Sequence, residues 1–135
     1  MNIITTLLIL VPISVICWWI YLAYKYTHPR KLSWEQARFL AGAYNKILRN
    51  KDHKALIIDI DKLYHKILLW IGHKWDFWAI LKSEPREIGD INKIWNLHKM
   101  RNKLVHDFNT FDEEHLRRNA DEYKKEVQIL LKKVS

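Results

Sequence analysis

The sequence predicts an all-α protein of one domain, and three observations carry this prediction. Apolar residues recur three and four positions apart along most of the 135 residues. Two segments begin with a capping box, Ser33 with Gln36 and Thr110 with Glu113. The alternating pattern of strands is nearly absent. The expected fold is an N-terminal transmembrane helix followed by a bundle of four to five helices.

The N-terminal segment predicts a membrane anchor. Residues 3–24 are mostly apolar and contain no Lys, Arg, Asp or Glu. As a helix they span about 33 Å, which is enough to cross the core of a bilayer. A cleaved signal peptide fits poorly, because no basic residue precedes the run and bulky Trp and Tyr occupy the place of a cleavage site. We therefore expect residues 1–24 to form a retained transmembrane anchor.

The charges after this run predict its orientation. Lys25, Arg30 and Lys31 lie in residues 25–32, which we interpret as a basic juxtamembrane linker. The positive-inside rule then places the rest of the chain in the cytoplasm, and the protein at the inner or plasma membrane as a single-pass protein. Cys17 is the only cysteine, so an internal disulfide and a cysteine-based zinc site are excluded.

Residues 33–135 are expected to form the bundle. A first helix, residues 34–48, has one buried stripe. A second, about 54–71, is apolar over much of its surface and is predicted to be the central core helix. Gly72 suits its C-terminal end.

The later segments are predicted from the same signals. Residues 73–87 are the least regular and suggest a short helix or packed loop. Trp75, Phe77 and Trp78 within it are aromatics that either pack in the core, the preferred interpretation, or stack on bases. A further helix begins near Glu87 or Asp90 and runs past residue 101, and the last helix follows the second capping box.

The most informative segment lies near the end of that penultimate helix, where Arg101 is followed directly by Asn102 and, after four intervening residues, by His106. A guanidinium binds phosphate oxygens in a planar fork, and an imidazole transfers protons near neutral pH. The same residues also fit an ordinary amphipathic helix. The net charge of +8 favours an anionic partner, but charge alone does not choose between RNA, DNA and a membrane surface.

This motif, with the acidic segment at residues 55–63 in an earlier helix, resembles the HEPN (higher eukaryotes and prokaryotes nucleotide-binding) family of helical bundles. The family's motif is an arginine, a neighbouring polar residue, and a histidine four to six positions after the arginine. The resemblance covers roughly residues 33–131. Within the family, the chain looks like small, membrane-anchored bacterial members. One departure is Phe108, which stands where many HEPN toxins have a tyrosine.

The resemblance implies a metal-independent ribonuclease, often a toxin or defence effector, with two motifs facing each other across a homodimer cleft. Arg101 would hold the scissile phosphate and counter the charge that develops in the transition state. His106 would act as general base or general acid, and Asn102 would orient the phosphate or the histidine. The alternative is a non-catalytic HEPN-like module for dimerisation, nucleotide binding or partner docking.

Other residues near the motif have supporting interpretations. Lys99 and Lys103 flank it and are expected to bind the substrate. His98, one turn before Arg101, either assists or is a half-buried polar residue. Asp61 either fixes Arg101 by an ion pair or is a solvated helix residue.

No cofactor and no metal are expected. The seven histidines are scattered along the sequence, and none forms a helical pair with a glutamate between. The apolar run, the resemblance and the basic charge together predict three partners: a membrane, a second copy of the chain and RNA. The sequence does not identify a protein partner or antitoxin.

Overall fold

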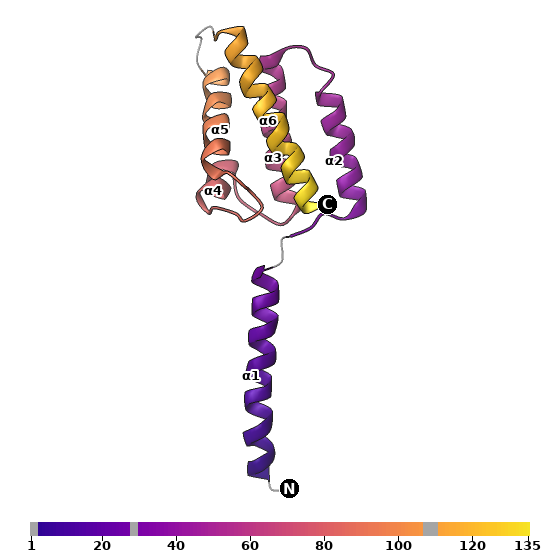
Figure 1. Cartoon of the computed structure of the whole chain (residues 1–135), viewed down its shortest axis with the longest axis vertical. Helices are drawn as coiled ribbons and strands as arrows, with labels where there is room; N and C mark the ends of the chain where they lie inside the picture. The colour runs from indigo at the N-terminus through magenta and orange to yellow at the C-terminus, as the bar shows by residue number, and fades with distance from the viewer. Residues whose placement is uncertain (1–2, 28–29, 107–110) are drawn as a thin grey trace.

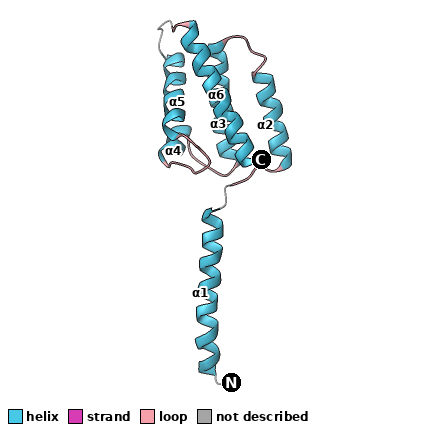
Figure 2. Ribbon diagram, in the orientation of Figure 1, coloured by secondary structure: helices cyan, strands magenta, loops and turns pink. Residues whose placement is uncertain are grey.

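The protein is all-helical over the residues that the computed structural model describes, which are 3–27, 30–106 and 111–135. This part of the chain contains six helices and no strand (Figures 1 and 2): α1 (Ile3–Thr27), α2 (Trp34–Ile47), α3 (His53–Trp70), α4 (Phe77–Lys82), α5 (Ile91–His106) and α6 (Glu113–Val134). The predicted all-α class is confirmed.

Four of these helices, with the short α4, form a bundle around α3. Helix α3 contacts α2, α5 and α6. In Figure 1, α6 lies against α3, while α2 and α5 stand on opposite sides of that pair. The α3 residues buried in the core are Leu56, Ile57, Ile60, Leu63, Tyr64, Ile67 and Leu68. The predictions of a helical bundle and of its central helix are therefore confirmed.

The local signals that start and end the helices act as the sequence predicts. Ser33 and Gln36 form the capping box of α2, in which each side chain bonds to the backbone N–H of the other residue. After α3, Gly72 has a φ of 105°, a left-handed conformation that glycine adopts without a steric penalty. Helix α6 begins after Asp112, whose carboxylate accepts from the His115 backbone N–H. The predicted cap at Thr110 lies outside the described residues.

The two ends of the bundle sequence are tied together. The Leu32 backbone N–H donates a 2.7 Å hydrogen bond to the Val134 carbonyl at the end of α6. The Lys31 ammonium donates to the Ser135 carbonyl at 2.8 Å. As a result, the entry to α2 and the C-terminus lie at the same end of the bundle, where α1 departs as a separate rod (Figure 1).

The structure contradicts the predicted transmembrane anchor at residues 1–24. Among the helices of the described part of the chain, none is both long enough and apolar enough to cross a membrane. Helix α1 contains Pro12 in its interior and Lys25 in its last turn. The predicted single-pass topology and the localisation at the inner membrane with a cytoplasmic bundle depended on that anchor, and they are corrected with it. The membrane as a partner stays a prediction.

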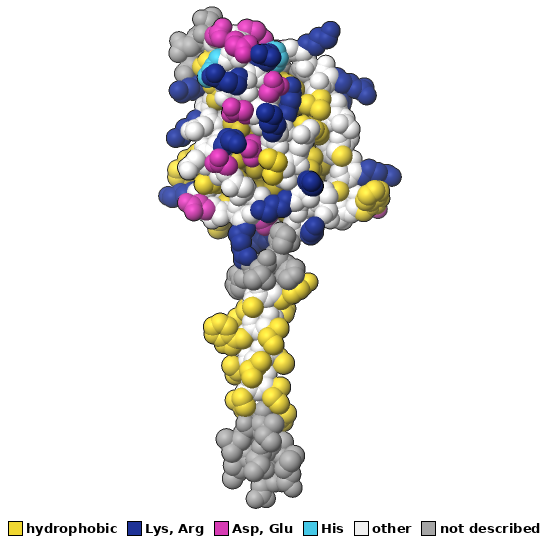
Figure 3. Space-filling view, viewed as in Figure 1, with side chains coloured by type: hydrophobic (Ala, Val, Ile, Leu, Met, Phe, Trp, Pro, Cys, Tyr) yellow, Lys and Arg dark blue, Asp and Glu magenta, His cyan; other side chains and the backbone are white. Residues whose placement is uncertain are grey.

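The described side chains of α1 are nonetheless mostly exposed and apolar, whereas the bundle carries the charges (Figure 3). Lys and Arg side chains are distributed over the visible face of the bundle, with Asp and Glu between them. The basic character that the sequence indicates therefore belongs to the bundle surface.

Candidate functional site

Helix α5 carries the residues of the predicted motif. The Asp90 carboxylate accepts a 2.9 Å hydrogen bond from the Lys93 backbone N–H, which caps the first turn. One face of the helix packs in the core through Ile94, Leu97 and Leu104. The remaining faces of α5 then decide which polar side chains meet one another and which meet solvent.

Arg101 points inward, toward α3. Its Nε lies 3.5 Å from Oδ2 of Asp61, whose side chain is 5% exposed. One terminal nitrogen of Arg101 donates a 2.9 Å hydrogen bond to Oδ1 of Asn102. Of the two interpretations of Asp61, the structure therefore shows the ion pair. A carboxylate this deeply buried needs such a counter-charge.

His98 binds the same carboxylate from α5. Its Nδ1 lies 2.9 Å from Oδ1 of Asp61, and its Nε2 lies 3.3 Å from Nδ2 of Asn102. The imidazole also meets the ring of Phe77 edge-on, with 4.7 Å between the centroids. His98 is only 8% exposed, so it lies deeper than the half-buried position that the sequence suggests.

The contacts of Asn102 define the tautomer of His98. A guanidinium can only donate, so the Asn102 oxygen must face Arg101 and its NH₂ group must face His98. Nε2 of His98 then accepts, and Nδ1 carries the proton that is donated to Asp61. With a neutral imidazole, one anion and one cation, the group is electrically balanced.

Tyr123 of α6 completes the cluster, and sequence reasoning missed its polar role. Its hydroxyl donates a 2.6 Å hydrogen bond to Oδ1 of Asp61. Burial raises the pKa of Tyr123 well above the usual value, and the nearby Asp61 charge raises it further. The sequence shows Tyr123 only as an apolar position of the last helix. We call Asp61, His98, Arg101, Asn102 and Tyr123 the Asp61 network.

His106 is not part of this network. It is the last residue of α5 and is exposed. Five residues along a helix correspond to a rotation of about 140°, so the side chains of Arg101 and His106 leave α5 in different directions. Residues 107–110, which include Phe108, follow directly and lie outside the described residues. The structure thus brings Arg101 together with Asp61, His98 and Asn102, and places His106 elsewhere.

The outer face of α5 presents Lys99 and Lys103 to solvent beside two hollows. One hollow, of about 500 Å³, is lined by Trp78, Asn92, Trp95, Asn96 and Lys99. The other, of about 480 Å³, shares Asn96 and Lys99. Its lining also includes Asn102 and Lys103 of α5 and Asn119 of α6. The predicted substrate-binding lysines therefore lie at these hollows.

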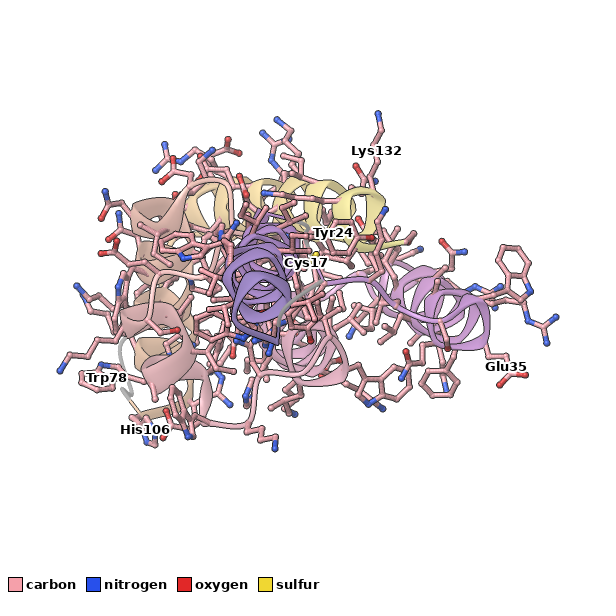
Figure 4. All side chains as sticks on the ribbon, turned by 90° about the horizontal axis from the view of Figure 1, so that it is seen from below. Cys17, Tyr24, Glu35, Trp78, His106 and Lys132 are labelled. Atoms are coloured by element: carbon pink, nitrogen blue, oxygen red, sulfur yellow. The ribbon has the colours of Figure 1, made fainter. Side chains whose placement is uncertain are left out.

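The aromatic residues before and within α4 divide into two groups. Phe77 is 4% exposed and packs on Tyr64 and His98, as the core interpretation predicts. Trp75 and Trp78 are 64% and 52% exposed, so that interpretation is wrong for them. In Figure 4, Trp78 and His106 project from the same side of the bundle, remote from Glu35 of α2.

The fold and this site define a small helical bundle with a buried polar network and a basic, partly aromatic outer face. Within the described residues, no cluster of three or more His, Cys, Asp or Glu side chains could hold a metal ion. No family model matches the chain, and no curated protein or solved structure is significantly similar to it. The HEPN resemblance therefore depends on the motif and its place in the bundle.

Proposed function

We propose that this chain is a HEPN-like module that binds RNA or nucleotides through the outer face of α5. The observation that carries this proposal is that the basic side chains of α5 fall into two groups, one paired inside the bundle and one exposed to solvent. Arg101 is bound to Asp61, whereas Lys99 and Lys103 are exposed beside two adjoining hollows.

The Asp61 network supports a scaffold role for Arg101. A guanidinium already paired with a buried carboxylate has less charge to offer a phosphate, and removing it would leave Asp61 uncompensated. His98 is likewise engaged at both ring nitrogens. The network joins α3, α5 and α6 and so holds α5 in place for binding.

Electrostatics support the choice of ligand. The chain has a net charge of +8, and exposed lysines attract phosphate groups without a sequence preference. The asparagine amides in the hollows offer both donors and acceptors, which suits the edges of nucleobases.

The ribonuclease is the second candidate, and the exposure of His106 at the end of α5 favours it. Arg101 would hold the phosphate, His106 would transfer the proton, and Asn102 would orient the phosphate. Because the two side chains leave α5 in different directions, His106 of one subunit would have to meet Arg101 of another across a homodimer cleft.

One experiment tests both candidates. The full-length chain is incubated with labelled RNA and a chelator, beside Arg101→Ala, His106→Ala and the double variant Lys99→Ala/Lys103→Ala. The binding module predicts a complex without cleavage, which the lysine double variant weakens at low salt and which His106→Ala leaves unchanged. RNA cleavage that both Arg101→Ala and His106→Ala abolish would replace the module by the ribonuclease. If the wild-type chain neither binds nor cleaves RNA, both candidates fail.

A further inference from the structure

We infer that the hollow lined by Trp78, Trp95, Asn92, Asn96 and Lys99, here called the tryptophan groove, holds a base of single-stranded nucleic acid by stacking. This inference rests on the proposed function and names the subsite and the strand form that it requires.

The two tryptophan rings form a fixed platform. Their centroids are 6.0 Å apart, and the rings meet edge-on at 78°. Such a contact holds both rings in one orientation. Trp78 nevertheless leaves 52% of its surface exposed, although a small bundle gains stability from burying its aromatics. An exposed tryptophan ring offers a face on which an unpaired base can stack.

Each of the two rings has a lysine ammonium over one of its faces. The Lys82 ammonium lies 5.0 Å from the Trp78 ring centroid, and the Lys99 ammonium lies 5.7 Å from that of Trp95. A nucleotide stacked in the groove would present its phosphate to one of them. The cation and the π-surface are therefore both available within one nucleotide's reach.

The third expected contact is between the edge of the base and the side-chain amides of Asn92 and Asn96. They stand one turn apart on the same exposed face of α5, and both line the groove. An amide can donate and accept, so such a pair tolerates several bases. The groove is thus suited to weakly sequence-dependent binding.

The groove continues into the second hollow through Asn96 and Lys99. From Asn92 to Lys103, α5 rises about 16 Å, so the track accepts a short strand and not only one nucleotide. Of the described residues that line the two hollows, none is acidic. The positive charge of the two hollows favours a polyanion over an apolar peptide. A single strand is favoured over a duplex, because the bases of a duplex are stacked on one another and cannot stack on the tryptophans.

Fluorescence anisotropy on the full-length chain tests the inference. The probes are fluorescein-labelled oligouridylate, the matching deoxythymidylate strand and an RNA duplex, at low salt. The variants are Trp78→Ala and Trp78→Phe. The matched control is Trp34→Ala, which removes an even more exposed tryptophan (77%) from α2, outside the groove. Lys99→Ala is compared with Lys62→Ala, another exposed lysine.

We expect Trp78→Ala to weaken single-strand binding about tenfold, Trp78→Phe to retain most of the affinity, and Trp34→Ala to have no effect. Lys99→Ala should lower the salt dependence, whereas Lys62→Ala should not. Equal affinities of Trp78→Ala and Trp34→Ala, or preference for the duplex, overturn the stacking site while binding elsewhere on the chain survives. If wild-type protein binds none of the probes, the proposed function itself fails. Where single strands do bind, the ratio of the RNA affinity to the DNA affinity shows which strand the groove prefers.

Discussion

The phenol of Tyr123 donates a 2.6 Å hydrogen bond to the carboxylate of Asp61 and thereby joins α6 to α3 in the core. Both residues are almost fully buried, at 0% and 3% exposed. A hydrogen bond to a charged group in such a place contributes more than a neutral one, because unpaired charge is costly there. This bond is the link between the last helix and the network that holds Arg101.

Replacing Tyr123 with Phe should destabilise the fold by about 1.5–3 kcal/mol, since the ring remains and only a hydrogen bond to a carboxylate is lost. Urea unfolding followed by circular dichroism measures this change. Tyr44→Phe is the matched control, because the Tyr44 hydroxyl donates to a backbone carbonyl, that of Lys124, at 3.2 Å. The control should lose about 1 kcal/mol or less. Equal losses in the two variants would argue against a special role for Asp61.

Asp61→Asn should cost about 3–5 kcal/mol, because it leaves the inward-facing Arg101 without its counter-ion. Adding Arg101→Met should recover part of that loss, since the unpaired charge is then removed as well. The free energies of unfolding of both single variants, the double variant and the wild type form a double-mutant cycle.

Asp59→Asn is the control for this cycle. Asp59 lies two residues earlier on α3, is 44% exposed and lies 3.9 Å from the Lys62 ammonium. Its substitution should change stability by less than about 1 kcal/mol. Strictly additive effects of Asp61→Asn and Arg101→Met would show that the two side chains do not interact.

Local sequence signals were sufficient for much of the fold. The capping box at Ser33 and Gln36 and the left-handed glycine at position 72 depend on a few neighbouring residues, so the sequence predicts them well. The apolar stripes also identify α3 as the central helix. The predicted start of α6 misses Asp112, which can cap a helix as well as a threonine can.

Long-range partners could not be predicted in the same way. Asp61 and Tyr123 are 62 residues apart, and nothing in the sequence pairs them. Helical rotation does, however, place Arg101 and His106 on different sides of α5, which the spacing alone already implies. The anchor predicted at residues 1–24 is contradicted, because no helix in the described part of the chain is both long enough and apolar enough to cross a membrane.

The tautomer of His98 is a third prediction. At a pH near 8, NMR of the ring nitrogens should show Nδ1 protonated and Nε2 unprotonated, because Asp61 accepts at Nδ1 and Asn102 donates at Nε2. Asn102→Asp replaces the donor with a charged acceptor and should change the ring-nitrogen shifts. Protonation at Nε2 in the wild type would mean that the Asn102 amide is reversed and that Arg101 is bound differently.

The final prediction concerns pH and His73, which follows α3. Burial lowers the pKa of His73, nearby Glu87 raises it in part, and Arg30 lowers it again. Nε2 of His73 lies 3.5 Å from Oε2 of Glu87. Because the folded protein then holds this proton less tightly than the unfolded chain, stability is retained above the unfolded pKa of about 6.5 and falls as the pH drops below it.

His73→Gln removes this titration, so the free energy of unfolding should depend less on pH between about 5.5 and 7.5 than in the wild type. Glu87→Gln should have the opposite effect on the same slope, because it removes the one neighbour that favours the imidazolium. Urea titrations across this range measure both slopes. Identical slopes in the wild type and His73→Gln would show that His73 is protonated equally in the folded and unfolded states.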